Sequence, residues 1–299
     1  MKEIHCSGSP HEIGFAHGSG AAVEIARGIA FYESLFKQKS DLNWTEVKAL
    51  SSDFNDTIQA QWPRYYEELQ GISSNHDSRK GSAHGVIGVA QGAERDILDI
   101  VALNVRSEIV FGQFSDGCTS LFCRGEKYTF MGQNWDAKWM EEQAPNLVNL
   151  TIVQESLPSI KMVTEAGIIG KIGLNSEGVA VCFNAIRAHG ITKGQMPCHL
   201  GLRLALESAS AEEAAASLEA IGMASSGHFL IGDAETAIGL EFTSKTFARV
   251  PVNESNFLVH SNHLLLDHPD VFEPRWLDDS PMRLETLTCS RTNRTIHSR

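Results

Sequence analysis

The sequence predicts an α+β protein in which two antiparallel sheets are stacked between helical layers. Apolar residues recur at helical spacing over most of the first 112 positions, whereas short β-rich runs separated by glycine or polar turns dominate after Gly117. Two helical stretches interrupt this second part. With 299 residues, 42% of them hydrophobic, the chain is long enough to bury a sizeable core.

The N-terminal part is expected to form a helical layer. Apolar residues repeat every three or four positions from Ile13 to Phe36 and again from Glu94 to Val110. The stretch 72–89 between them contains SSNHDSRKGSAHG, which is polar, rich in glycine and without periodicity. We expect a surface loop there, because such a segment has no apolar face to bury.

The part after Gly117 is typical of an antiparallel meander. Its β-rich runs are TSLFCR, YTFMGQNW, LVNLTIV, SIKMVT, IIGKIGL and GVAVCFNAI, then HFLIGD, AIGLEF, FARVPV and FLVHSN. Helices are expected between these two groups, over His199–Glu207 and Ala211–Ala220. Ser210, with Glu213 three residues later, provides an N-cap for the second helix.

Charge and composition exclude several classes of protein. The net charge is -12 and the basic residues are scattered, which argues against a nucleic-acid partner. The first residues, MKEIHCSGSPHEIG, lack the apolar core of a secretory signal, and no window approaches 18 apolar residues. We therefore expect an intracellular protein with no membrane association.

The six cysteines, at positions 6, 118, 123, 182, 198 and 289, have neither the density nor the spacing of a disulfide scaffold. We expect reduced thiols, with those at 123, 182 and 198 in the core. No CxxC pair indicates zinc. His260 and His263 would fall on opposite faces of a strand FLVHSNH, so we expect no metal site there.

The pair Gly117-Cys118 has the chemistry needed for self-cleavage. A thiol can attack the carbonyl carbon of the preceding residue, and glycine has no Cβ to obstruct that attack. The amide becomes a thioester, which water then hydrolyses. The released α-amine, with an ordinary pKa of about 7.7 to 8.0, could act as the base for its own thiol. The alternative is that Cys118 is an ordinary small core residue.

Several long blocks carry a resemblance to a known family. They are DGCTSLFC, GQNWD, TEAGIIGKIGLNSEGVAV and HSNH, with HEIGFAHG, WPRYYEELQGI and GAERD before them. In this order, through about residue 287, the chain resembles the acyl-coenzyme A:isopenicillin N acyltransferase family of filamentous fungi. The resemblance implies a four-layer αββα N-terminal-nucleophile (Ntn) fold. It also implies cleavage into fragments 1–117 and 118–299, which together form one domain as a heterodimer.

The resemblance also implies roles for individual residues. Cys118 is the nucleophile, Asp136 in NWD orients the site, and Asn262 in HSNH donates to the oxyanion. A neutral amide suits that last task because negative charge develops on the substrate oxygen. Four hydroxyl residues are expected to support the site or line the substrate pocket: Thr119, Ser120, Ser225 and Ser226.

The implied reaction is acyl transfer in penicillin biosynthesis. Cys118 would take an acyl group from acyl-coenzyme A, or from the side chain of isopenicillin N, and pass it to 6-aminopenicillanic acid. Acyl-coenzyme A is then a co-substrate, and no cofactor is expected. An amidohydrolase side activity is also expected, because the partition between water and an amine depends on the shape of the pocket.

The C-terminal part departs from the family pattern. Family members continue for several tens of residues and supply a catalytic arginine after a cysteine. The flanks of Cys289-Ser290-Arg291 do not match that segment, so the role is not transferred to Arg291. The ending, His297-Ser298-Arg299, is not the family's peroxisomal signal, which favours the cytoplasm.

Two other hypotheses remain open from the sequence. The chain could be an inactive truncated paralogue or splice product, since missing strands would expose an edge and unseal the core. It could also be an unprocessed thiol enzyme that pairs Cys118 with His189 or His228, although no papain-type signature is present.

Overall fold

The computed structural model describes residues 1–74, 95–110, 117–136, 140–274 and 277–292, with the backbone alone at 110, 136, 140–141 and 290–292. In this part of the chain the strands form two sheets. The eight-stranded sheet has the order β1 (Lys2–Gly8), β4 (Leu147–Gln154), β5 (Ile160–Glu165), β6 (Ile172–Asn175), β7 (Ala180–Ala185), β8 (Gly227–Gly232), β9 (Ala237–Phe242), β10 (Phe247–Pro251). The three-stranded sheet has the order β11 (Phe257–His260), β2 (Gly117–Arg124), β3 (Thr129–Asp136).

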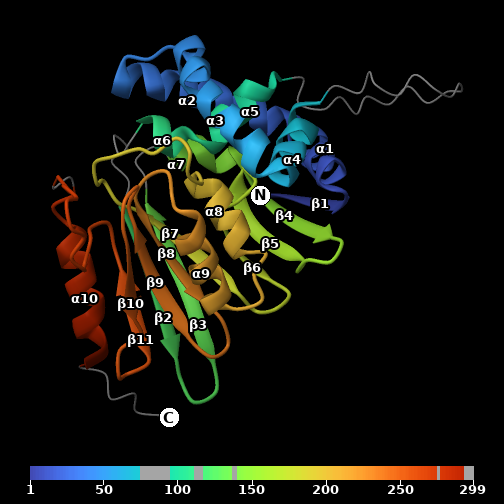
Figure 1. Ribbon diagram of the computed structural model, residues 1–299. Helices are drawn as coiled ribbons and strands as arrows, with labels where there is room; N and C mark the ends of the chain where they lie inside the picture. The colour runs from blue at the N-terminus through green and yellow to red at the C-terminus, as the bar shows by residue number, and fades with distance from the viewer. Residues whose placement is uncertain (75–94, 111–116, 137–139, 275–276, 293–299) are drawn as a thin grey trace, which may run out of the picture.

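The helices lie on both sides of this pair of sheets (Figure 1). Those of the N-terminal part are α1 (Pro10–Gly20), α2 (Ala22–Ser40), α3 (Trp44–Gln61), α4 (Pro63–Ser73), α5 (Ile97–Asn104) and α6 (Arg106–Val110). Those of the second part are α7 (Met140–Gln143), followed by a 3-10 turn (Ala144–Asn146), then α8 (Cys198–Ala205), α9 (Ala211–Ile221) and α10 (Ser280–Thr292). None of the helices in the described ranges has the length and apolar character of a bilayer span.

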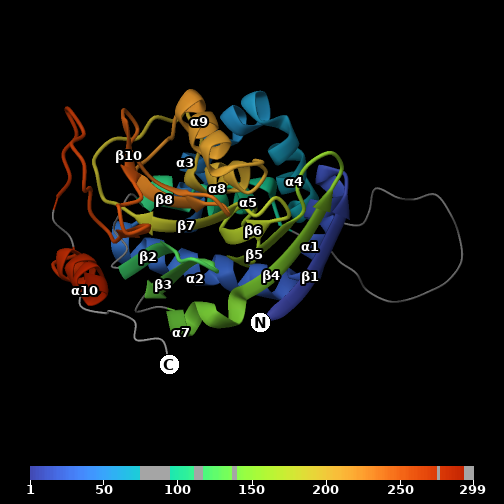
Figure 2. The same cartoon turned by 90° about the horizontal axis from the view of Figure 1, so that it is seen from below.

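The order of the layers follows from the alternation of side chains along β2. Ser120 contacts Asn184 of β7 in the large sheet, whereas Thr119 contacts Arg283 of α10. Because successive side chains of a strand point to opposite faces, α10 lies on the outer side of the small sheet. Figure 2 shows α8 and α9 over the opposite face of the large sheet. The predicted α+β class, with stacked sheets between helices, is confirmed.

The N-terminal part is not wholly helical, which corrects the prediction for this region. Lys2–Gly8 forms β1, which pairs in parallel with β4 at the edge of the large sheet. Ile4 and Cys6 are buried while their neighbours are exposed. This alternation of buried and exposed residues covers a short strand that is followed at once by the helical pattern, so periodicity did not indicate the strand. The helices predicted from Ile13 and from Glu94 are each divided in two, at Ala21 and at Val105.

Glycines explain the close packing of α1 on α4. A Cβ on Gly14 would lie 1.9 Å from the Glu68 carbonyl oxygen, and one on Gly18 would lie 2.4 Å from that of Ile72. On the other helix, a Cβ on Gly71 would lie 2.2 Å from the His11 carbonyl oxygen. The block HEIGFAHG therefore lets two helix backbones touch, because only glycine leaves the required space.

The β-rich runs that were predicted after Gly117 begin with β2. β2 begins at Gly117 and lies between β3 and β11, with Cys118 opposite Trp135 and Ser120 opposite His260. Further along β2, Phe122 packs against Cys182, Leu230 and Leu258 between the two sheets. This buried contact fixes the register of β2, since a slip of one residue would turn Phe122 to the other face. The second residue of the strand is thereby held in a defined place.

Candidate active site

Cys118 is the buried second residue of β2, and both of its backbone groups are held by side chains. Its N–H donates to Asn262 Oδ1 at 2.7 Å. Its carbonyl oxygen accepts from Arg283 Nη1 at 2.6 Å. Only 5% of the residue is exposed. The predicted nucleophile is therefore on a rigid element, with its nitrogen, the predicted new chain end, already at a hydrogen-bond acceptor.

Asn262 lies two residues after the end of β11, at the meeting point of three elements. Its Nδ2 donates to the Ala185 carbonyl at 2.9 Å, and its backbone N–H donates to Ser280 Oγ at 2.8 Å. Its Oδ1 accepts from both Cys118 N and Arg283 Nη2, the latter at 2.9 Å. The amide is thus fixed with its oxygen on the nucleophilic residue, and its Nδ2 keeps one hydrogen beyond the bond to Ala185.

Arg283 joins the site although the sequence analysis did not identify it. It lies on α10, where Nε donates to Asp279 one turn earlier at 2.9 Å. Nη1 donates to the Cys118 carbonyl and to Thr119 Oγ1 at 2.8 Å, and Nη2 donates to Asn262. The segment PMRLETL around Arg283 does not follow a cysteine closely, whereas Cys289-Ser290-Arg291 has the order of residues that the family resemblance implies.

Thr119 and Ser120, the two residues after Cys118, form hydrogen bonds on opposite sides of the small sheet. Thr119 Oγ1 accepts from Arg283 on the outer side of the small sheet. Ser120 Oγ donates to Asn184 Oδ1 at 2.6 Å on the inner side. Asn184 was not predicted; it is fully buried, and its Nδ2 has no partner among the described residues. One buried hydrogen-bond donor beside the strand of Cys118 is thus left unsatisfied among the described residues.

Ser225 and Ser226 are bonded away from this group. Ser225 Oγ donates to Glu108 Oε1 at 2.9 Å, and burial raises the pKa of that carboxyl. Ser226 Oγ donates to the Ile186 carbonyl at 2.8 Å and accepts from Ala188 N at 3.1 Å. In these contacts the Ser225 hydroxyl is bonded to Glu108 and the Ser226 hydroxyl to the backbone of residues 186 and 188. Their predicted part in substrate binding stays a prediction.

Asp136 ends β3, and its backbone is paired with Gly117. The residue that was predicted to orient the site therefore stands directly opposite the predicted scissile bond in the register of the sheet. Its side chain lies outside the described part of the chain. The predicted role of Asp136 stays a prediction.

A buried group of charges lies behind the nucleophilic strand. Lys171 Nζ is 3.2 Å from Glu165 Oε2 and 4.4 Å from the centre of the Trp135 ring, the residue opposite Cys118. Burial lowers the pKa of Lys171, while attraction to Glu165 and to a Cys118 thiolate opposes this effect. Arg106 completes the group with a 2.6 Å bond to Glu165. Positive charge near a thiol favours the thiolate form, which is the nucleophile.

The remaining buried cysteines are chemically different. Burial raises the pKa of Cys6 and of Cys182 to about 12 and that of Cys198 well above its ordinary value. These thiols stay protonated near neutral pH and behave as small core residues. The prediction of core thiols at Cys182 and Cys198 is confirmed, whereas Cys123 is only partly buried.

His228 and His189, the two histidines of the papain-like hypothesis, contact Asn184 and Phe272 respectively. His228 Nδ1 is 3.0 Å from Asn184 Oδ1, and burial, followed by the charge of His260, lowers the pKa of His228 well below its ordinary value. Such an imidazole is a weak base near neutral pH. The ring of His189 packs edge-on against Phe272 with 5.0 Å between centroids. His263 lies beyond β11, which ends at His260, so the predicted strand through FLVHSNH is too long.

A cleft of about 850 Å³ lies between the sheets, toward the other end of β2. Phe122, Met131 and Cys182 line it, together with residues of β4, β5 and β6. Phe122 is four residues beyond Cys118, a distance of about 13 Å along a strand. Gln133, which pairs with Ser120, also lines the cleft, so the cleft extends along the inner face of β2 toward Cys118.

Comparison with known proteins relates the sequence of this chain to a known family. Residues 123–293, which include Asn262 and Arg283, match the family described as "Acyl-coenzyme A:6-aminopenicillanic acid acyl-transferase". The chain is 41% identical over 284 residues to "Acyl-coenzyme A:6-aminopenicillanic-acid-acyltransferase 40 kDa form" of Emericella nidulans. That match covers 94% of this chain and 74% of the relative.

A solved structure also matches in part. Penicillin V acylase from Agrobacterium tumefaciens aligns with 14% identity and a TM-score of 0.28, covering 58% of this chain and 50% of the acylase. That overlap is too slight to define the fold, which rests on the layers described above. The sequence match, by contrast, spans nearly the whole chain and confirms the predicted relationship. The chain belongs to the acyl-coenzyme A:6-aminopenicillanic acid acyl-transferase family.

Proposed function

We propose that this protein is a self-activating cysteine acyltransferase that acylates 6-aminopenicillanic acid. Acyl-coenzyme A, or the side chain of isopenicillin N, would supply the acyl group. The observation that carries the proposal is the 2.7 Å bond from Cys118 N to Asn262 Oδ1, with Arg283 bound to both residues. An enzyme that uses its new N-terminus needs this arrangement, because the amine and the thiol must stay together at one oxyanion donor.

Activation would begin with attack of Cys118 Sγ on the Gly117 carbonyl carbon. The C–N bond of the peptide then breaks, the nitrogen takes the thiol proton and becomes an amine, and Gly117 is held as a thioester. Water hydrolyses that thioester, which leaves a carboxylate on Gly117 and the free thiol on Cys118. The two fragments, 1–117 and 118–299, would stay together as a heterodimer, because strands of both lie in the large sheet.

The acyl-transfer cycle would use the same atoms. The Cys118 amine accepts the thiol proton, and the sulfur attacks the thioester carbonyl of acyl-coenzyme A. The coenzyme A thiol leaves with a proton, and the acyl group stays on Cys118. The amine of 6-aminopenicillanic acid then attacks, forms the amide and releases the thiol. When an amide such as the side chain of isopenicillin N supplies the acyl group instead, the C–N bond breaks and the nitrogen leaves with a proton as the amine. Water then attacks the acyl-enzyme in the amidohydrolase side activity.

Asn262 and Arg283 would act on this cycle in different ways. Asn262 Oδ1 holds the amine, and the Nδ2 hydrogen that is not bonded to the Ala185 carbonyl would be the donor to the oxyanion. Loss of a single oxyanion donor typically lowers kcat by about 10²–10³. Arg283 carries no acceptor, so it serves as a fixed donor that keeps the Cys118 carbonyl and Asn262 in register.

An acyl-transfer assay tests the proposal. The purified protein, a short-chain acyl-coenzyme A and 6-aminopenicillanic acid should yield the N-acyl product and free coenzyme A thiol. Cys118→Ala should form neither, while Cys182→Ala, a change to a buried thiol between the sheets, should still form both. Equal product from the wild type and Cys118→Ala would overturn the assignment. Absence of product from the wild type would favour the inactive alternative.

A further inference from the structure

A buried carboxylate, Glu241 of β9, lies behind the candidate site and is not part of the mechanism above. Its two oxygens accept four hydrogen bonds, two from imidazoles and two from backbone N–H groups: His260 Nε2 at 2.7 Å, His268 Nε2 at 3.3 Å, Leu265 N at 2.6 Å and Leu266 N at 3.1 Å. A carboxylate offers about four acceptor positions, so this one is saturated. Burial alone would raise the pKa of Glu241, but these donors, His260 first, lower it.

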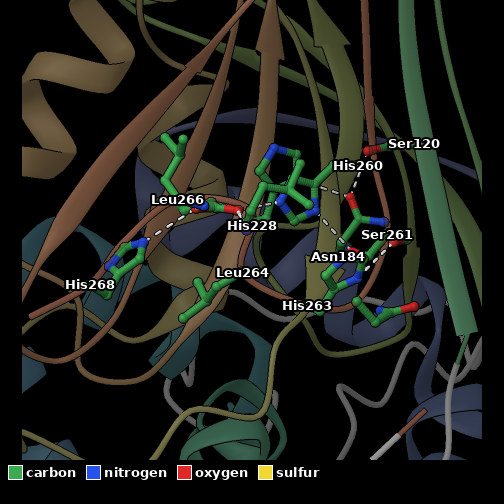
Figure 3. A network of polar contacts seen from close by, with 12 residues as sticks. Ser120, Asn184, His228, His260, Ser261, His263, Leu264, Leu266 and His268 are labelled. Atoms are coloured by element: carbon green, nitrogen blue, oxygen red, sulfur yellow. Dashed lines mark hydrogen bonds and ion pairs between the residues drawn. The ribbon is translucent and has the colours of Figure 1, made fainter. Parts of the chain in front are cut away.

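His260 bonds Glu241 with one ring nitrogen and the backbone with the other. The Nδ1 atom of His260 lies 3.0 Å from the Ser261 carbonyl oxygen, and Nε2 lies 2.7 Å from the carboxylate. The ring of His228 stacks on it, with 3.6 Å between centroids and 7° between planes (Figure 3). The His260 ring is therefore fixed at both nitrogens, and the His228 ring lies flat against it.

The stacked pair reaches Asn184. His228 Nδ1 and Ser120 Oγ both approach Asn184 Oδ1, at 3.0 Å and 2.6 Å. With two donors on its oxygen, the amide of Asn184 is held with its unpartnered Nδ2 directed away from them. Gly239 completes the fit, because a Cβ there would lie 2.8 Å from His228 Nε2. The sheet is thus built to accept an imidazole at this point.

Glu241 also bonds residues on both sides of Asn262. It accepts from the side chain of His260, two residues before Asn262, and from the backbone N–H groups of Leu265 and Leu266, shortly after it. The backbone N–H of Asn262 itself is bound by Ser280 Oγ from α10. The Asn262 amide therefore lies in a short segment that is tied to β9 at each end. A shift of this segment would move Oδ1 away from the Cys118 nitrogen.

We propose that Glu241 is a positioning residue for acyl transfer. It fixes Asn262 by tying down the chain segment on both sides of it, and it fixes Asn184 through the stacked His260 and His228. The proposal rests on the proposed function. Glu241 touches no reacting atom, so its loss should lower kcat more than it raises KM. A displacement of about 1 Å at a reacting group can reduce the rate about 100-fold.

Glu241→Gln in the full chain tests this inference. The glutamine amide places an N–H group where the carboxylate accepted a hydrogen bond, so one of the four donors loses its acceptor. The segment around Asn262 should therefore shift. We expect kcat to fall about 100-fold with little change in KM. Glu241→Asp keeps the charge and should recover part of the loss. Glu273→Gln is the matched control in the same segment. Only the N–H of Leu264 is bonded to the two oxygens of Glu273 among the described residues, so the amide oxygen of glutamine can still accept it and the segment should not shift. Equal kcat in Glu241→Gln and Glu273→Gln would overturn the proposal.

Nuclear magnetic resonance gives a readout that does not require activity. In protein with ¹⁵N-labelled histidine and asparagine, the ring-nitrogen signals of His260 should move in Glu241→Gln, because Nε2 loses its carboxylate partner. The Asn262 side-chain amide signal should move in Glu241→Gln and stay in place in Glu273→Gln. An unmoved signal would refute the positioning role even if the wild type transferred no acyl group. A wild type without acyl transfer but with the expected shifts would contradict only the proposed function.

A milder variant covers the case in which Glu241→Gln does not fold. His268→Asn removes one of the four donors at the edge of the cluster, where Thr246 Oγ1 also bonds His268. We expect a smaller fall in kcat and a smaller shift of the Asn262 amide signal. Wild-type kcat and an unmoved signal in this variant would also count against the proposal.

Discussion

At the scale of single residues, Arg283 tests the proposed site independently of the nucleophile. Its planar fork contacts the Cys118 carbonyl, Thr119 and Asn262 at once. A lysine keeps the charge but cannot reproduce three directed bonds. We expect Arg283→Lys to lower kcat about 100-fold, a magnitude typical of lost positioning. Steady-state kinetics would measure this. Arg124→Lys, at the exposed far end of β2, is the control, and a similar loss in both variants would contradict the role.

A residue of the site could be predicted when a recognisable motif surrounds it in the sequence. Cys118 and Asn262 were found because short motifs surround them, and the structure brings the two residues into contact. Arg283 lies 165 residues from Cys118 in the chain, and its role depends on α10 returning to the small sheet. Glu241 stands in a strand, AIGLEF, on the face opposite to Leu240 and Phe242, so alternation does not predict its burial. Its partners come from β11 and the turn that follows it.

At the scale of elements, helical periodicity concealed β1 and the break between α1 and α2, because both depend on packing against distant segments. The glycines of α1 give a sharp test of that packing. A Cβ on Gly14 would meet the Glu68 carbonyl at 1.9 Å, whereas a Cβ on Gly28 of α2 would meet nothing within 4 Å. Gly14→Ala should destabilise the protein by about 1–3 kcal/mol or more. Gly28→Ala should stabilise it by about 0.5–1 kcal/mol. Urea unfolding measures both, and the same sign for the two variants would contradict the packing.

At the scale of the whole molecule, buried ion pairs predict how stability depends on pH. Burial would raise the pKa of Glu165, but Arg106 and Lys171 outweigh it and lower the pKa below the ordinary value of 4.5. This contribution to stability is therefore present above that value and is lost as the pH falls through the folded-state pKa. The free energy of unfolding should decline below about pH 4.5, and less steeply in Glu165→Gln. Glu235→Gln, an exposed control, should follow the wild type. An unchanged slope in Glu165→Gln would refute the linkage.

The layered architecture could be predicted because strands and helices are separated along the chain and each has its own period. The arrangement of the site could not, because it depends on which layer each loop and helix returns to. α10 shows this most clearly, since its own sequence reveals little amphipathic order while its position completes the site.

The central claim is that the chain cuts itself ahead of Cys118, and the masses of the purified protein test it most directly. We predict two fragments that copurify, one starting at Met1 and one whose first residue is Cys118 by N-terminal sequencing. Cys118→Ala should remain one uncut chain. An active, folded wild type whose Gly117-Cys118 bond is intact would contradict the account.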